Sequence, residues 1–203
     1  MRKSDSLNYL KSLGLPICQF KLFWSIQIAQ ALEYANYLRD SGYSVGLRTD
    51  LAYGEDSGMR LPFVKRISNE EIVKIFCKYG DSYVYILSES PGIYNMVSQG
   101  VVYLLPDLTA LIYANEVDKC SCREAIEGVN SHKNVVEVIN SWYCNPNDKY
   151  SILRAYLVRA FKKDNNIIGK RIEWSFFKKW GMVFWQLSDD ESFKDIINNL
   201  INT

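Results

Sequence analysis

The chain lacks several of the residues on which common sites depend. Among its 203 residues there is a single histidine, His132. One histidine excludes sites with two histidine ligands, and it leaves no strong Ser-His or Cys-His pair for nucleophilic catalysis. The cysteines are odd in number, and no two of them form a CxxC pair. We interpret them as reduced thiols of a cytosolic protein. They are Cys18, Cys77, Cys120, Cys122 and Cys144.

The chain also lacks a marked excess of positive or negative residues, and it lacks a long hydrophobic run. Lysine and arginine total 24 against 23 acidic residues, a net charge of +1, which gives no support for a nucleic-acid or anionic-membrane partner. The longest apolar run, Val101 to Val117, is interrupted by Pro106-Asp107 and is too short to span a bilayer. Lys3, Asp5 and Lys11 interrupt any apolar segment of a signal peptide. We therefore expect a cytoplasmic protein.

Apolar and aromatic residues are plentiful, at 48% and 14%, so the chain can bury a large core. Its patterns predict an α+β fold with two lobes, an N-terminal α/β lobe over residues 1–80 and a strand-rich lobe over 81–203, with a ligand cleft between them. The predicted helices are 4–12, 26–40 with Ser25 as N-cap, 69–79 with a Ser68/Glu71 capping box, 121–127, 150–163 and a last one ending at Ile201. The predicted strands are 44–49, 61–67, 83–87, 97–105, 109–117 and a hairpin within 169–187.

That hairpin holds two polar residues in otherwise apolar strands, Glu173 and Gln186. Alternation places Ile172, Trp174 and Phe176 on one face of the first strand, and it groups Gln186 with Met182 and Phe184 on the second. A carboxylate and an amide are costly to bury unless something satisfies them, and Mg²⁺ would do so with oxygen ligands. The alternative is an ion pair of Glu173 with Arg171 or Lys178 at the sheet surface.

A second candidate is the loop that follows the strand Ser44 to Thr49. It begins at Asp50 and continues to Gly58, with two glycines, acidic residues and hydroxyls. Loops of this composition at strand ends can hold phosphate. They are also typical of plain turns. The composition alone leaves both interpretations open.

Five stretches together resemble the ATP-grasp nucleotide-binding domain of the phosphoenolpyruvate synthase and pyruvate phosphate dikinase family. Each stretch is short, but their order and spacing agree over nearly the whole chain. The resemblance implies an ATP-grasp fold with a nucleotide cleft between two α/β lobes. The stretches are Lys3–Leu7 followed by Leu13–Pro16, Val45–Thr49, Gln99–Tyr103, Arg123–Gly128, and Ile172–Trp174 with Gln186 thirteen positions after Glu173.

The resemblance also implies cofactors and roles. Lys3 and Arg48 would bind the phosphates of ATP and act as the catalytic pair, because lysine and arginine suit phosphoryl oxygens. Glu173 and Gln186 would hold Mg²⁺, which would bridge phosphate oxygens. Glu124 would contact the ribose. Backbone groups of the strand Tyr83 to Leu87 would contact adenine.

The sequence departs from the family in three ways. The family's arginine two residues after the glutamine is replaced by Ser188, and the loop over residues 51–60 is shorter. No stretch of the 203 residues resembles the family's phosphohistidine domain, and the segment around His132 does not look like the carrier. Any transferred phosphate would need an acceptor on another chain or a small molecule. Three hypotheses remain: an ATP-dependent phosphotransferase or ligase, a degenerate fold for nucleotide sensing or protein interaction, and an unrelated α+β domain in which Glu173 and Gln186 are structural.

Overall fold

A computed structural model describes residues 1–53, 63–90, 96–116, 137–139 and 147–189. The predicted helices at 121–127 and before Ile201, most of the loop after Asp50, and the residues Glu124 and His132 lie outside these ranges. The described helices and strands are α1 (Lys3–Ser12), β1 (Phe20–Phe23), α2 (Ile28–Asp40), β2 (Ser44–Leu51), β3 (Phe63–Val64), α3 (Asn69–Tyr79), β4 (Tyr83–Ser90), β5 (Met96–Leu104), β6 (Ala110–Glu116), β7 (Glu137–Ile139), α5 (Lys149–Phe161), β8 (Arg171–Phe177) and β9 (Gly181–Ser188).

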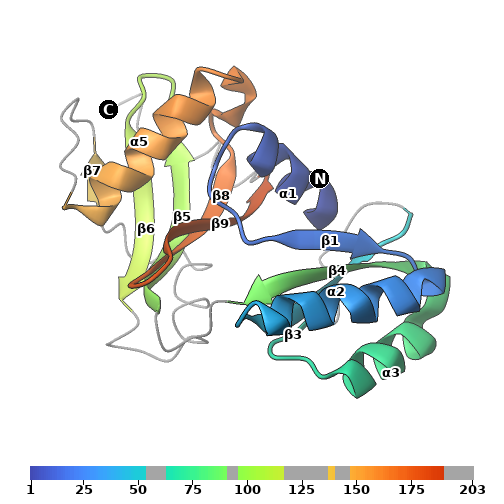
Figure 1. Ribbon diagram of the computed structural model, residues 1–203. Helices are drawn as coiled ribbons and strands as arrows, with labels where there is room; N and C mark the ends of the chain where they lie inside the picture. The colour runs from blue at the N-terminus through green and yellow to red at the C-terminus, as the bar shows by residue number, and fades with distance from the viewer. Residues whose placement is uncertain (54–62, 91–95, 117–136, 140–146, 190–203) are drawn as a thin grey trace. The chain divides into compact units, whose positions relative to one another are not determined.

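The chain divides into two compact units, and each combines helices with an antiparallel sheet (Figure 1), so the α+β prediction is confirmed. The first unit comprises Met1–Asp5 and Cys18–Gly92, and the second comprises Ser6–Ile17 and Ile93–Thr203. The sequence placed the boundary at residue 80. The first unit instead extends to Gly92, because β4 pairs with both β1 and β2 in its sheet.

The sheet of the first unit has the strand order β1-β4-β2-β3. Helices α2 and α3 lie along one of its faces (Figure 1). Val45 and Leu47 of β2 are buried in the core on this side. Because side chains alternate along a strand, Gly46, Arg48 and Asp50 lie on the opposite face. The other buried members of this core are Phe23, Ala31, Tyr34, Ala35, Leu38, Ile67, Ile72, Phe76, Tyr85 and Leu87.

Of the two helix caps predicted in this unit, one is confirmed and the other is wrong. The capping box before α3 is confirmed, since the Glu71 N–H donates to Ser68 Oγ at 3.2 Å and the Ser68 N–H donates to Glu71 Oε2 at 2.8 Å. The prediction that Ser25 caps α2 is wrong. Ser25 begins a 3-10 turn, Ser25–Gln27, and α2 starts only at Ile28. The Ser25 hydroxyl donates to Asp81 instead.

The sheet of the second unit has the order β7-β6-β5-β8-β9. One face packs with α1 and α5 into a core in which Trp174 and Phe184 are almost completely buried. The Leu187 N–H donates to the buried Ser6 Oγ at 2.5 Å, which ties α1 to β9. The other buried members of this core are Leu10, Leu13, Leu15, Val102, Leu104, Ala110, Ile112, Ala114, Tyr150, Leu153, Leu157, Ala160, Ile167, Ile172, Met182 and Leu187.

The hairpin of β8 and β9 is confirmed, but its second strand does not alternate as predicted. The register shifts between Glu173 and Trp174, where Glu173 pairs with Gln186 and Trp174 pairs with Phe184. This bulge leaves one extra residue on β9, so Leu187 joins Phe184 in the core. Gln186 is therefore not on the face of Met182 and Phe184. It lies on the other face, beside Glu173.

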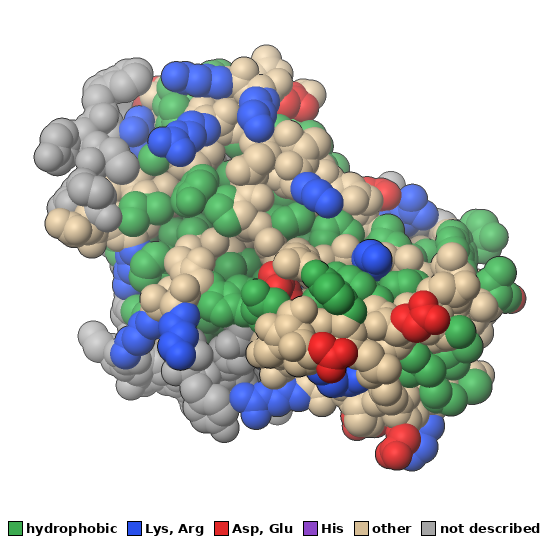
Figure 2. Space-filling view, viewed as in Figure 1, with side chains coloured by type: hydrophobic (Ala, Val, Ile, Leu, Met, Phe, Trp, Pro, Cys, Tyr) green, Lys and Arg blue, Asp and Glu red, His purple; other side chains and the backbone are tan. Residues whose placement is uncertain are grey.

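Acidic and basic side chains are interspersed on the face of the molecule shown in Figure 2. Among the described residues, the large apolar side chains with the greatest exposure include Ile26, Tyr53 and Tyr37. No helix in the described ranges has both the length and the apolar character needed to cross a membrane.

Candidate functional site

The structure places the two predicted metal ligands next to each other. Glu173 and Gln186 are directly opposite in the β8–β9 ladder, and on its other side Glu173 pairs with Val101 of β5. The side chain of Glu173 is 36% exposed, and Gln186 is half-buried. Directly opposed side chains have Cβ atoms roughly 4.5–5.5 Å apart, so the carboxylate and the amide can reach a shared ligand.

The same carboxylate takes part in an ion pair. Arg171 Nη1 donates to Glu173 Oε1 at 2.6 Å, and the arginine side chain is only 17% exposed. The surface pairing that the sequence offered as the alternative is therefore present. The metal interpretation stays a prediction beside it, because Gln186 lies in the position opposite Glu173.

The donor set of Glu173 and Gln186 fits a magnesium ion that shares its coordination with a ligand. Within the described ranges no group of three or more His, Cys, Asp or Glu side chains could hold a metal alone. Mg²⁺ is often bound by one or two carboxylates, with water and substrate phosphates completing the octahedron. One carboxylate and one amide oxygen on adjacent strands match that pattern better than a metal site built from protein ligands alone.

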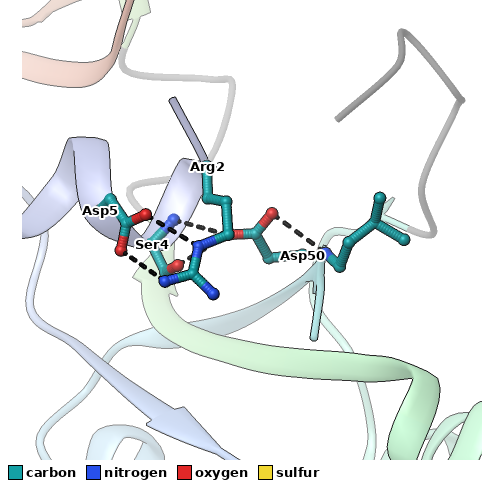
Figure 3. A network of polar contacts seen from close by, with 5 residues as sticks. Arg2, Ser4, Asp5 and Asp50 are labelled. Atoms are coloured by element: carbon teal, nitrogen blue, oxygen red, sulfur yellow. Dashed lines mark hydrogen bonds and ion pairs between the residues drawn. The ribbon is translucent and has the colours of Figure 1, made fainter. Parts of the chain in front are cut away.

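In the first unit a buried carboxylate fixes the start of α1 (Figure 3). Asp50 is fully buried and accepts hydrogen bonds from Ser4 N–H at 2.9 Å, from Ser4 Oγ at 2.7 Å and from Leu51 N–H at 3.1 Å. Asp50 thereby satisfies an N–H group that a helix N-terminus otherwise leaves without an intrahelical partner. The sequence treated Asp50 as the first acid of a loop, which is wrong, because β2 extends through it to Leu51.

The hydrogen bonds between Ser4 and Asp50 also fix where the two predicted phosphate-binding residues, Lys3 and Arg48, lie relative to each other along β2. Lys3 precedes Ser4, and Arg48 lies on the same face of β2 as Asp50, roughly 7 Å further along the strand. Both cations are half-buried. The structure therefore brings Lys3 to the end of the strand that carries Arg48.

The strand predicted to contact adenine is central in its sheet. Tyr85 to Leu87 of β4 pairs with β2 on one side and with β1 on the other. Backbone groups that pair on both sides are not available to a base. The prediction that the strand Tyr83 to Leu87 presents its backbone to adenine is therefore wrong for these three residues.

Arg48 also belongs to a buried ionisable cluster that the sequence did not reveal. Glu89 is 7% exposed, and its carboxylate accepts the Gln19 N–H at 2.8 Å. Burial raises the pKa of Glu89, although the bond from Gln19 opposes that change. The pKa of the Cys18 thiol is raised by burial and by Glu89, while the charge of Arg48 lowers it.

We expect Glu89 to make stability depend on pH. A carboxyl whose pKa is raised in the folded state binds more protons there than when unfolded, so stability falls as pH rises from its ordinary pKa through the raised one. Glu89→Gln keeps an oxygen that can accept the Gln19 N–H and removes this dependence. The melting temperature of the variant minus that of the wild type should therefore increase between about pH 4 and pH 8. A difference that is constant across this range would contradict the assignment.

Four of the five predicted site residues lie in the described ranges, and they are divided between the units. Lys3 and Arg48 belong to the first unit, and Glu173 and Gln186 belong to the second. Glu124 lies outside the described ranges. The prediction that all of them face one nucleotide therefore stays a prediction.

No protein-family model and no curated protein sequence matches this chain. Several solved structures are similar in fold. The macrocyclase MdnC of Microcystis aeruginosa, bound with precursor peptide MdnA, has a TM-score of 0.55 and 10% identity, covering 99% of this chain and 60% of that one. A RiPP-associated ATP-grasp ligase of Chryseobacterium gregarium, in complex with ADP and with a leader and core peptide, has a TM-score of 0.55 and 10% identity, covering 98% and 54%.

The ADP complex of PurK, an N5-carboxyaminoimidazole ribonucleotide synthetase, has a TM-score of 0.53 and 15% identity, and covers 90% of this chain and 42% of that one. This chain thus spans between 42% and 60% of the length of these three proteins. At such low identity the likeness concerns the fold. The chain has the α+β architecture of an ATP-grasp domain, as the sequence predicted.

Proposed function

We propose that this protein binds ATP together with Mg²⁺ and acts as an ATP-grasp phosphotransferase or ligase on an acceptor that another molecule or chain supplies. The observation that carries the proposal is the pairing of Glu173 with Gln186 across β8 and β9, in a chain with an ATP-grasp fold. An acidic and an amide oxygen in this position suit a cation shared with phosphates. The fold and the residues thus support the same ligand by independent routes.

Each site residue then has a distinct role. Lys3 and Arg48 bind phosphate oxygens, Lys3 as a point charge and Arg48 through its forked donors. Glu173 and Gln186 hold the magnesium ion, which when bound supplies positive charge against the phosphates. Glu124 contacts the ribose. These residues bind and orient the nucleotide so that its terminal phosphate can meet an acceptor.

The two reaction classes draw on different support. The sequence stretches resemble the phosphoenolpyruvate synthase and pyruvate phosphate dikinase family, which favours phosphoryl transfer. The similar solved structures include a macrocyclase and a peptide-bound ligase, which favours activation of a carboxylate. In both classes ATP is consumed only with an acceptor, so product analysis with carboxylate-bearing peptides and with small-molecule acceptors separates them.

A second candidate function is nucleotide sensing without catalysis. Ser188 stands where the resembling family has an arginine, and Arg171 already pairs with the carboxylate of Glu173. Both features are expected in a site that binds a nucleotide without transferring its phosphate. Binding of ATP without turnover, across a range of acceptors and in the presence of Mg²⁺, would favour this function over the first.

We expect Arg48→Ala to weaken ATP binding by about 1–3 kcal/mol, the usual scale for a lost hydrogen bond to a charged group. Calorimetric titration with ATP measures this loss. The matched contrast is Arg39→Ala in the same unit. Arg39 donates to Asn69 Oδ1 at 2.6 Å and to the Ile67 carbonyl at 2.7 Å, so its loss should lower the melting temperature and leave ATP affinity unchanged. An Arg48→Ala variant that melts much lower yet binds ATP like the wild type would show that Arg48 is structural.

A further inference from the structure

We propose that the tip of the β8–β9 hairpin, together with the adjoining outer edge of β9, is a docking site for an extended acidic polypeptide segment. The inference goes beyond the proposed function, because it requires neither nucleotide nor metal. The tip is the loop Lys178-Lys179-Trp180, which joins Phe177 of β8 to Gly181 of β9. Both lysines are exposed, and Trp180 is half-buried. Gly181 has a φ of +71°, the left-handed conformation that commonly completes three-residue hairpin loops.

The two lysines of the tip carry the charge that the hairpin leaves unbalanced. Residues 170–189 include four cations and two acids. Both acids are engaged elsewhere on the hairpin, Glu173 by Arg171 and Asp189 by Lys170. Within the part of the chain that the structure describes, neither lysine of the tip has a hydrogen-bond or ion-pair partner. The tip therefore presents two positive charges that no described acid neutralises.

Aromatic contacts hold the tip in place. Phe177 is buried, and its ring centroid lies 6.5 Å from that of Trp180 and 6.3 Å from that of Trp185. Trp185 Nε1 also donates to the Ser175 Oγ at 2.8 Å. A loop fixed by packed rings holds its charges in a defined place, so it loses little conformational freedom when a partner binds.

Beside the tip, the outer edge of β9 offers backbone groups. β9 is the last strand of its sheet, and its outer edge is covered at Phe184, whose N–H donates to the Pro16 carbonyl at 2.8 Å. No described residue pairs with this edge between Gly181 and Val183. Alternate residues of an antiparallel strand point their N–H and C=O groups to the same side, so Met182 directs its own outward, as Phe184 does. An extended segment can add to such an edge through main-chain hydrogen bonds.

The charge of the tip determines which segment fits. A strand that adds to β9 beside two lysines is favoured when it carries acidic side chains, and repelled when it carries basic ones. Nucleic acid fits less well, because its binding sites are basic patches or stripes of many residues, and the net charge of the whole chain is only +1.

The competing explanation is that the lysines only keep this edge from pairing with other strands, since lysine is a common protection of exposed edges. The two roles differ in the sign of the charge they need. A charge of either sign protects an edge, whereas docking of an acidic segment requires positive charge. Reversing the charge of both lysines therefore separates the two roles.

The experiment measures the binding of a labelled peptide in which glutamate alternates with threonine, by fluorescence anisotropy at low ionic strength and without ATP or Mg²⁺. The double variant Lys178→Glu with Lys179→Glu should bind this peptide about tenfold more weakly than the wild type, or worse, because attraction becomes repulsion. Added salt should reduce the difference. Lys162→Glu with Lys163→Glu is the matched control, since these lysines are also adjacent and exposed in the second unit. It should bind like the wild type.

Two further peptides test the chemistry of the partner on the wild type. In one, glutamine replaces every glutamate, which removes the charge and keeps the length. In the other, proline replaces every threonine, which keeps the charge and removes N–H groups that a paired strand needs. Both should bind more weakly than the original peptide.

Several results would overturn the inference. A wild type that does not bind the acidic peptide would do so, as would equal losses in the two double variants, or a glutamine or proline peptide that binds as well as the original. Tighter binding of single-stranded DNA of the same length would also overturn it, in favour of nucleic acid. If the charge-reversed variant does not fold, Lys178→Ala with Lys179→Ala takes its place, with the same expected order and a smaller loss.

Discussion

Replacing Gly100 with Ala should lower the free energy of unfolding by about 3 kcal/mol or more, at the upper end of the cost of overpacking a core. A Cβ at this position would lie 2.0 Å from the carbonyl oxygen of Tyr113 and 2.9 Å from the Cα of Ala114. Both atoms belong to the backbone of β6, to which β5 is hydrogen-bonded, so no side chain can rotate to make room. Chemical denaturation of both proteins measures the difference.

Gly46 provides the matched control, because it is also a buried strand glycine. A Cβ there would meet Ser88 and Ser90 at 3.7–3.8 Å, which is ordinary van der Waals contact. Gly46→Ala should therefore be neutral or stabilising by up to about 1 kcal/mol, through a less flexible unfolded chain. If Gly100→Ala were as stable as Gly46→Ala, the close approach of β5 to β6 at Gly100 would be contradicted.

The consequence of Gly100→Ala extends to the candidate site. Gly100 pairs with Trp174 on its other side, and Trp174 follows Glu173 in β8. A displacement of β5 from β6 at this point would disturb the strand that carries the proposed metal ligand. We therefore expect the variant to lose nucleotide affinity together with stability, whereas site variants should lose affinity alone.

Glu173→Gln should remove most of the dependence of nucleotide affinity on Mg²⁺. The substitution keeps the shape of the side chain and removes the charge that a hard cation prefers. We expect the strengthening of ATP binding by Mg²⁺ to fall by about tenfold or more, the scale known for changes around metal ligands. Titration of both proteins with ATP, with and without Mg²⁺, gives the comparison.

Stability distinguishes the metal role of Glu173 from a purely structural one. Its ion pair with Arg171 is partly exposed, and such pairs contribute roughly 0–1 kcal/mol, so Glu173→Gln should leave the unliganded fold nearly unchanged. The exposed Glu70 of α3 serves as the control, since Glu70→Gln removes an equal charge far from the hairpin in sequence. Identical Mg²⁺ dependence of Glu173→Gln and the wild type would end the assignment of Glu173 as a metal ligand.

Local sequence patterns determined much of this fold. Period-two alternation predicted the β8–β9 hairpin, and the capping box at Ser68 and Glu71 predicted the start of α3. These features depend on residues that are neighbours in the chain, so their spacing is sufficient to predict them. The order of short stretches along the chain was sufficient to predict the ATP-grasp fold.

Tertiary structure alone decided which residues meet. The bulge after Glu173 placed Gln186 opposite it and away from the core, and the same register set Arg171 opposite Ser188. Because β4 lies between β1 and β2, its backbone groups pair with these strands and are not available to contact adenine. The hydrogen bond from Ser4 to Asp50 joins residues that are 46 positions apart in the sequence. Strand register and long-range hydrogen bonds arise from pairing between distant segments, and the local pattern of a single segment does not specify its partner.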